Sequence, residues 1–545
     1  MLGARPSVVE RFAAEELKAY IQRLTGREHR DENDAFEVLI GRPETLARIP
    51  ASIAAASEDD RFVVRTVHEN GHTALVLTGG QDRSCLFAVY RLLETFGVRF
   101  YGYRDRNGEV VPKLDRLPVP DLNITERPMM KYRFVSDNGF SAADKTKLTA
   151  IADWAAKNRC NTIMLTPSRA GETWDQIAIE EVKKRGLAIA GPGHILARLT
   201  PDRALFATHP EYFPLINGQR RDCYSAAWGG CTSLCVSNAE ALRLTVVNAI
   251  RYLDANPCID LFALFPPDGP QRGVQCQCPD CARLTTSDRY LTLINAVAAA
   301  LASRPHAPRL MWIAYNECGM VPPQVRPLDQ GRNMVLMWCN DLRDHGHAFD
   351  SETNRHAASY LANKPRLRII KTDGFPHPGD EQLSAWERWQ SWAGFLREHH
   401  AQGGVVLLEY YNAHVAHSLG IPWLGHCQSG PWPDGVIQRD FQTYAAQGIR
   451  GWQNCTDWYN DSPSPYWNWL AAQMQWNPDA DAEALDRDFY QHFYGPAGDA
   501  MQAFFKEAWG AIVHGKPVPK VMLPSSADPG IAARLKLVAD WQKRN

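Results

Sequence analysis

The sequence predicts an α/β protein in which a (β/α)8 barrel, the TIM-barrel fold, follows a small N-terminal α/β domain and precedes a helical C-terminal region. Three observations predict it. Between residues 128 and 460, eight short apolar segments alternate with amphipathic segments. No glycine-rich nucleotide-binding turn follows the predicted strands, which favours a barrel over a doubly wound open sheet. The 545 residues, 45% of them apolar and 22% charged, suffice for more than one large core.

Residues 1–127 are expected to form the N-terminal α/β domain. The segment Glu10–Leu24 has apolar residues at helical spacing, and a second helix is predicted over Arg83–Phe96. The dipeptide Asn70-Gly71, which is typical of a two-residue hairpin turn, separates two strand candidates. A proline-rich linker then leads to the barrel. The predicted strands are Phe36–Ile40, Phe62–Val67 and Thr73–Thr78.

Residues 128–460 are expected to form the barrel, and residues 461–545 a helical region packed on it. The eight barrel strands are predicted at Tyr132–Ser136, Thr162–Thr166, Leu187–Ala190, Ile259–Phe265, Leu310–Tyr315, Met334–Trp338, Val405–Tyr410 and Ile449–Gln453. Helices are predicted at Lys145–Lys157, Trp174–Arg185, Ala239–Ala255, Ser287–Ala302, Glu381–His399 and Ile437–Gln447, and beyond the barrel at Pro465–Gln475, Ala482–Tyr494 and Ala497–Val513.

Charge and hydropathy exclude several classes of protein. The 59 Lys and Arg residues against 61 Asp and Glu residues exclude a strongly basic nucleic-acid binder and a polybasic membrane-surface protein. The longest apolar runs, such as Ile259–Phe265, are far shorter than the roughly 20 residues that a membrane span needs. Met1 leads into the first helix without a secretory leader, which predicts a cytoplasmic protein; a chain that had lost its leader would be secreted or periplasmic.

Polar side chains follow the predicted strands, where a barrel places its active site. A glycosidase needs a carboxyl that protonates the leaving oxygen, a second group that handles charge at the sugar carbon, and amides and rings that hold the sugar. The 17 Trp and 18 Tyr residues suit sugar stacking as well as core packing. The expected catalytic residues are Glu409, Asp268 and Glu317, and the expected substrate-binding residues are Asn138, His194, Trp338, Asp341, Tyr410, Tyr411 and Trp452.

Each predicted carboxylate has a structural alternative. Asp268 lies in Pro-Pro-Asp-Gly, which is also a favourable turn sequence. Glu409 ends a wholly apolar strand, where turn formation does not require a glutamate, so a functional role is favoured.

A cysteine motif, Cys276-Gln-Cys278-Pro-Asp-Cys281, is the most specific local signal in the sequence. Its three thiols could belong to a structural zinc site, for which an upstream cysteine or His194 would supply the fourth ligand. Simple structural thiols and a loop-pinning disulfide remain open alternatives. No organic cofactor is expected.

Several motifs resemble known families. The stretch Phe12–Leu17 with Leu86–Val98 resembles the small domain that precedes the barrel in family 20 hexosaminidases and family 67 α-glucuronidases. Over about residues 8–510, the chain resembles the bacterial domain of unknown function 4838, which includes glycoside hydrolase family 163, a family of endo-β-N-acetylglucosaminidases. The motifs behind this second resemblance are Pro266–Gly269, Cys276–Cys281, Arg289–Leu291 with Asn295, Trp476–Asp479 and Tyr494–Ala497.

The resemblance implies a retaining glycosidase for glycans with β-linked N-acetylglucosamine, in which the substrate's acetamido group is the nucleophile. One carboxyl would act as acid and base, and another would orient the acetamide. Family 20 enzymes have an adjacent Asp-Glu pair after the fourth strand, whereas this chain has only Asp268 there, so roles cannot be transferred. The alternatives are a non-catalytic glycan-binding protein, a glucuronidase-like enzyme and a zinc-dependent hydrolase centred on the cysteines.

Overall fold

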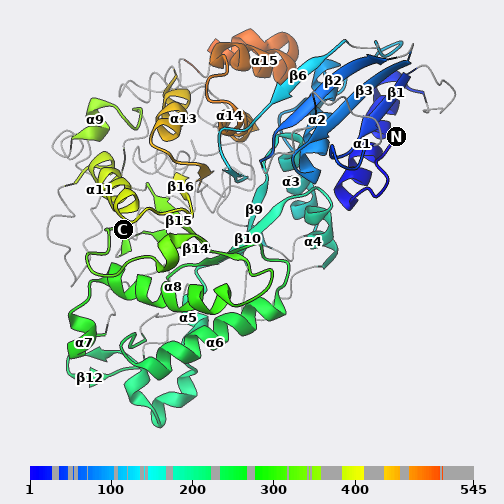
Figure 1. Ribbon diagram of the computed structural model, residues 1–545. Coiled ribbons are helices and arrows are strands. Elements are labelled where there is room, and N and C mark those ends of the chain that lie inside the picture. Colours follow the sequence, from blue (N-terminus) through cyan, green and yellow to red (C-terminus); the bar gives the residue numbers. More distant parts are fainter. Residues whose placement is uncertain are drawn as a thin grey trace, which may run out of the picture.

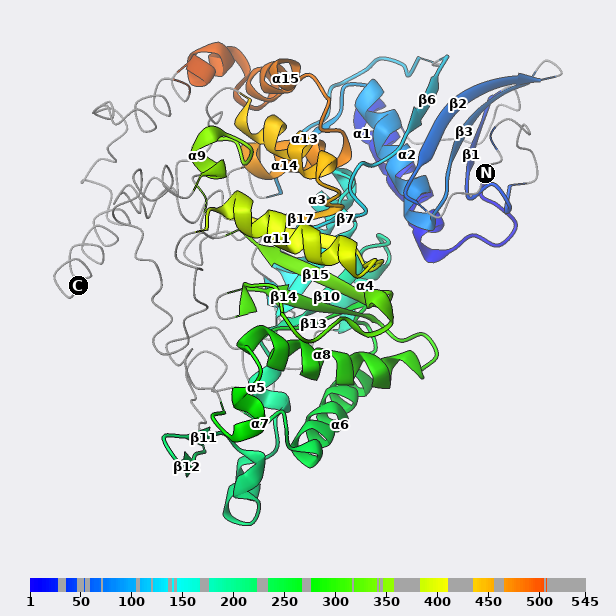
Figure 2. The same ribbon diagram turned by 60° about the vertical axis from the view of Figure 1, so that its left-hand side comes forward.

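A computed structural model describes residues 1–27, 36–46, 53, 59–69, 72–103, 108–118, 121–135, 140–141, 145–166, 176–222, 234–266, 276–315, 318–340, 343, 347–356, 383–409, 435–454, 465–503 and 506. It contains the predicted barrel beside an N-terminal four-stranded sheet (Figures 1 and 2). In this part of the chain, no helix combines the length and the apolar composition needed to cross a bilayer.

Eight parallel strands form the barrel, which confirms the predicted fold. Neighbouring strands pair in the order β17-β16-β15-β14-β13-β10-β9, with β7 beside β17. A parallel bridge between Phe134, directly after β7, and Thr162 of β9 closes the ring. A short strand, β8 (Phe140–Ser141), pairs with the end of β9. The barrel strands are β7 (Tyr132–Arg133), β9 (Thr162–Thr166), β10 (Ala188–Gly193), β13 (Leu261–Leu264), β14 (Arg309–Ala314), β15 (Met334–Cys339), β16 (Val405–Glu409) and β17 (Gly451–Asn454).

Helices surround the strands, and polar caps determine where two of them begin. Helix α8 begins after Thr285, whose side chain and that of Asp288 bond each other's backbone amides in a capping box. Ser384 and Glu387 do the same for α11, so this helix begins at Ala385 rather than at the predicted Glu381. The barrel helices are α3 (Lys145–Lys157), α4 (Gln176–Lys183), α6 (Ala239–Ala255), α8 (Thr286–Ala302), α11 (Ala385–Glu398), α13 (Val436–Ala446) and α14 (Pro465–Trp476).

The connection from β14 to β15 differs from the other connections. Its described residues from 318 onward contain a 3-10 turn, η4 (Leu328–Gly331), in place of an α-helix. Short elements also decorate the loops after the strands: α5 (Leu196–Leu199), η1 (Arg203–Ala207), η2 (Pro210–Tyr212), β11 (Leu215–Ile216), β12 (Gln219–Arg220), α7 (Pro279–Ala282) and α9 (Glu352–Arg355).

The N-terminal region has its own sheet, with strands in the order β1-β3-β2-β6. Strands β2 and β3 pair antiparallel, as the Asn-Gly signal predicts. Helices α1 and α2 pack together and share a core with the sheet. The elements are α1 (Val8–Thr25), β1 (Phe36–Ile40), β2 (Phe62–Glu69), β3 (His72–Gly79), α2 (Asp82–Thr95) and β6 (Asn123–Glu126). A separate two-stranded pair, β4 (Arg99–Phe100) and β5 (Glu109–Val110), lies between α2 and β6 in the chain.

The C-terminal helices join the barrel to the N-terminal sheet. Helix α14 contacts β7 and α13, and its last residue, Trp476, stacks on Phe62 at 5.4 Å between ring centroids. Helix α15 (Ala482–Tyr494) packs on Tyr101, whose ring contacts Phe489 edge-on. A 3-10 turn, η7 (Gly495–Ala497), follows α15. Most of the helix predicted over Ala497–Val513 lies outside the described residues.

A buried aspartate, Asp60, lies where the N-terminal domain meets the barrel. Its carboxylate accepts hydrogen bonds from Arg83 of α2 at 2.6 Å, Arg133 of β7 at 2.5 Å and Asn161 at 2.9 Å. Burial by itself raises the pKa of Asp60, but the Arg133 and Arg83 guanidinium groups outweigh it and lower the pKa to about 2.

We expect this aspartate to make the free energy of unfolding sensitive to acid. A pKa lower in the folded than in the unfolded state adds stability above pH ~4 that is lost as the pH falls toward the folded pKa. The shift corresponds to about 2 kcal/mol. Urea unfolding should therefore show that the stability difference between wild type and Asp60→Asn shrinks as the pH falls below about 4. Asp59→Asn, which removes a more exposed neighbour, serves as the control, and a pH-independent difference for Asp60→Asn would contradict the assignment.

Candidate active site at the barrel rim

The carboxyl ends of the barrel strands form the rim on which the predicted site residues were placed. Of these residues, the structure describes His194, Trp338, Glu409 and Trp452. The other predicted site residues lie outside the described residues: Asp268, Glu317, Asn138, Asp341, Tyr410 and Tyr411.

His194 lies at the rim, immediately after β10. Its half-buried ring packs edge-on against Phe265 at 5.6 Å and lies 6.1 Å from the ring of Tyr315, centroid to centroid. Nδ1 bonds the backbone carbonyl of Pro266. Because a carbonyl oxygen only accepts, Nδ1 carries the proton in this contact. The ends of β10, β13 and β14 are thereby joined by three rings, of which Phe265 is buried, whereas the half-buried rings of His194 and Tyr315 are of a kind that can contact a sugar.

Glu409 ends β16 in a buried polar network. Its Oε1 accepts hydrogen bonds from Asn340 Nδ2 at 2.7 Å, from Arg343 Nη1 at 3.2 Å and from the Tyr444 hydroxyl. Arg343 also binds Asp440 of α13 at 2.6 Å. The side chains of Glu409, Arg343 and Asp440 are 0% exposed. All three groups donate to Oε1, so this oxygen acts as an acceptor in the network.

Strand register shows which way Glu409 points. It shares a strand face with Leu407, because side chains alternate along a strand, and Leu407 is paired in register with Trp452. Trp452 faces outward, since its ring packs on Phe441 of α13 at 5.2 Å. The neighbouring Gln453 points the other way, into the barrel, where its amide contacts Met164 of β9. Glu409 therefore faces the helix layer, which agrees with its contacts to α13.

The two tryptophans predicted to stack on a sugar also belong to this helix-facing layer. Trp338 is 2% exposed and packs on Trp389 of α11 at 5.3 Å. Trp452 is 1% exposed. A buried indole has no free face for a ligand, so the structure places both rings in the core between strands and helices and not at the rim.

Three members of the buried network were not predicted from the sequence. Arg343 follows β15 in a polar loop, and Asp440 and Tyr444 lie one helical turn apart on α13. The four-residue spacing puts Asp440 and Tyr444 on one helix face. This spacing is visible in the sequence and could have indicated a polar helix face. Only the packing of α13 on β16 shows that this face meets Glu409 at the strand end.

A cavity of about 680 Å³ lies away from the rim, between the N-terminal domain, α14 and α15. Its charged lining is already paired: Arg159 binds Glu94 at 2.7 Å, and Arg99 binds Asp488 at 2.9 Å. Arg159 precedes β9, so the cavity lies toward the amino end of that strand, opposite the end at which barrel enzymes react.

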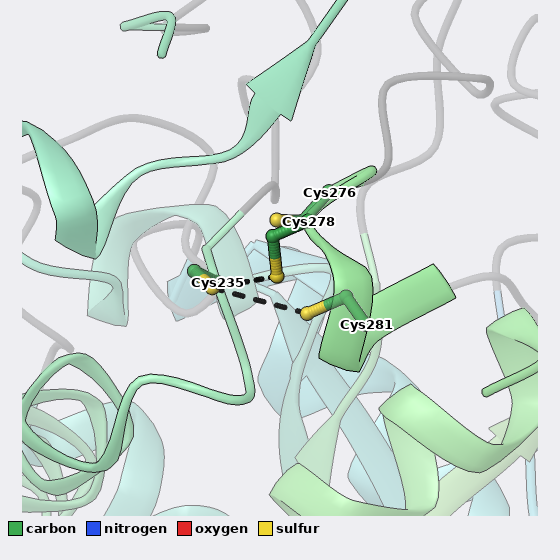
Figure 3. A group of neighbouring side chains, drawn as sticks. All are labelled: Cys235, Cys276, Cys278 and Cys281. Atoms are coloured by element: carbon green, nitrogen blue, oxygen red, sulfur yellow. Dashed lines mark hydrogen bonds between the residues drawn. The ribbon is translucent and has the colours of Figure 1, made fainter. Parts of the chain in front are cut away.

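Four cysteine thiols gather where Cys235, between η2 and α6, meets the three cysteines before and in α7 (Figure 3). Cys235, Cys276, Cys278 and Cys281 are buried, and their sulfur atoms all lie within 4.8 Å of one another. Hydrogen bonds with Cys235 and Cys281 lower the pKa of the Cys276 thiol, and the reciprocal bonds raise that of Cys281. The structure thus joins the three predicted metal ligands to an upstream cysteine, whereas His194 bonds Pro266.

Comparison with known proteins assigns a family. The model of a family described as Domain of unknown function (DUF4838) matches residues 103–364 and 430–506, which is more than half of the chain. No curated protein sequence is significantly similar to the chain.

The solved structures to which the chain is similar share little sequence with it. A family GH115 4-O-methyl-α-glucuronidase, BtGH115A, with specificity for decorated arabinogalactans, has a TM-score of 0.56 at 12% identity. The alignment covers 99% of this chain but 66% of that enzyme. A GH20 exo-β-N-acetylglucosaminidase from Vibrio harveyi has a TM-score of 0.46 at 11% identity, covering 92% of this chain and 74% of that one. A β-N-acetylhexosaminidase from Bacteroides fragilis has a TM-score of 0.44 at 12% identity, covering 93% and 91%.

Proposed function

The chain belongs to the DUF4838 family, and we propose that it is a glycoside hydrolase acting on glycans that contain β-linked N-acetylglucosamine. The observation that carries the proposal is the closed eight-stranded barrel, whose strands are followed in the sequence by ring, amide and carboxyl residues. The likeness to BtGH115A supports the fold, and the motif resemblance to glycoside hydrolase family 163 supports the substrate class and an endo-acting enzyme.

Two carboxyls are proposed to perform the reaction. Asp268 follows β13 by four residues, and Glu317 follows β14 by three. These strands are neighbours in the sheet, and adjacent parallel strands deliver the residues that follow them to the same rim. One carboxyl would protonate the leaving oxygen, and the other would orient the substrate's acetamido group as it attacks the sugar carbon with retention of configuration.

The remaining residues would bind the sugar or position the loops around it. His194 and Tyr315 lie beside the ends of β13 and β14, so their rings are proposed to contact the sugar. The catalytic role predicted for Glu409 stays a prediction, and its burial argues for a positioning role instead. Through Arg343, Glu409 ties the loop after β15 to α13.

A substrate screen tests the proposal. The full-length chain should release product from an aryl β-N-acetylglucosaminide or an N-glycan carrying this sugar, and not from an aryl glucuronide. Turnover should fall when the acetamide is replaced by trifluoroacetamide, because the weaker carbonyl nucleophile attacks the sugar carbon more slowly. Cleavage of the glucuronide alone would replace the proposal with a glucuronidase. Glycan binding without any hydrolysis would replace it with a non-catalytic binding protein.

A further inference from the structure

We propose that Cys235, Cys276, Cys278 and Cys281 bind one Zn²⁺ ion, which clamps the insertion after β10 to the segment after β13 (Figure 3). This site uses neither residue of the proposed carboxyl pair and does not depend on the proposed function. Cys235 lies near the end of the insertion, before α6, whereas the other three cysteines lie in and before α7.

The distances from the Cys235 sulfur to two neighbouring sulfur atoms fit a tetrahedral ion. Zinc lies about 2.3 Å from each thiolate, which places two sulfurs of a regular tetrahedron about 3.8 Å apart. Cys235 Sγ lies 3.6 Å from Cys278 Sγ and 3.8 Å from Cys281 Sγ. A disulfide would bring two sulfurs to about 2 Å and leave the others aside. Here Cys235 Sγ lies at nearly equal distances from the sulfur atoms of Cys278 and Cys281, as expected for ligands of one ion.

Donors around the cluster favour thiolates. The backbone N–H of Leu215 donates to Cys276 Sγ at 3.4 Å, and Arg220 Nη1 lies 3.9 Å from the same sulfur. The Ser237 hydroxyl lies 3.1 Å from Cys281 Sγ. Hydrogen bonds of this kind orient zinc ligands and stabilise the charge on their sulfur atoms.

Nearby arginines supply the charge that a buried site requires. Zinc with four thiolates carries a net charge of −2, which is costly to bury without nearby cations. Arg220 approaches Cys276, and the buried Arg289 donates from Nε to the backbone carbonyl of Cys281 at 3.0 Å. The two guanidinium groups match the charge of the loaded site.

The arrangement is that of a structural site. Four protein sulfurs complete the coordination of zinc and leave no position for substrate or water, unlike a catalytic zinc. The clamp also continues backbone contacts between the same segments, since Gln277 N donates to Leu215 O at 2.7 Å and Asn217 N to the Gln277 side chain at 2.7 Å. The ion would thus hold the β11–β12 hairpin against α7.

Metal analysis of the full-length chain, purified under reducing conditions with zinc present, tests the inference. We expect about one zinc per chain and, by X-ray absorption, four sulfur neighbours at about 2.3 Å. Cys235→Ser should lower the zinc content at least about fivefold, since the site loses one of its four ligands. Cys258→Ser, which alters a cysteine outside the cluster, should retain the metal.

Tryptic cleavage provides a readout independent of metal content. Arg220 and Arg221 lie in or directly after the clamped hairpin, so removal of zinc with a strong chelator should speed tryptic cleavage there at least about tenfold. Before chelation, Cys258→Ser should be cleaved there as slowly as wild type. The inference would be overturned by iron in place of zinc, by fewer than four sulfur neighbours, by a disulfide among these cysteines in the reduced protein, or by full zinc content in Cys235→Ser.

Discussion

Turnover of a β-N-acetylglucosaminide is expected to fall at least about a hundredfold in Asp268→Asn and in Glu317→Gln, with folding preserved. Each change removes a group that would move a proton or orient the acetamide, while the size of the side chain is kept. The two variants should separate by leaving group. The acid variant should lose much less activity on an aryl substrate whose leaving group needs no proton, whereas the orienting variant should lose activity on both substrates.

A matched control lies at the other end of β13. Asp260 precedes β13, at the end opposite Asp268, and binds Lys183 and the amide of Ile189 away from the rim. Asp260→Asn should therefore keep kcat within about threefold of wild type, as expected for a group remote from the reacting atoms. If Asp268→Asn and Glu317→Gln both remained as active as Asp260→Asn, these carboxyls would not perform the reaction.

Replacing Arg343 by methionine is expected to lower the free energy of unfolding by about 3–5 kcal/mol. The change leaves the carboxylates of Glu409 and Asp440 buried without the cation that lies between them. Chemical denaturation measures the loss. Arg439→Met, which removes an exposed arginine paired with Asp350, should cost at most about 1 kcal/mol, and equal losses in the two variants would contradict the argument.

Glu409→Gln tests the same network through activity. Asp440→Asn is its matched control, because it removes the other carboxylate bound to Arg343. If Glu409 only positions the loop after β15, both variants should lose about 1–3 kcal/mol of stability and retain comparable turnover. A hundredfold loss of kcat in folded Glu409→Gln, with Asp440→Asn still active, would restore Glu409 to the catalytic residues.

The fold was largely predictable because its signals are local. Most of the eight barrel strands are short, largely apolar runs, as is typical of buried parallel strands. A helix boundary differs from its prediction where a polar cap sets it, as at Ser384, which starts α11 four residues after the predicted Glu381. The site was less predictable. Glu409, Trp338 and Trp452 lie in or at the end of barrel strands, but a strand has two faces and these side chains point to the helix layer.

Sequence alone determined the barrel and its order of elements, together with the motif Cys276–Cys281, because alternation and spacing are properties of neighbouring residues. Tertiary structure decided which distant side chains meet. It brought Cys235 to the other three thiols and Arg343 between Glu409 and Asp440. Such pairings depend on strand register and helix rotation, and these are set by packing of the whole core.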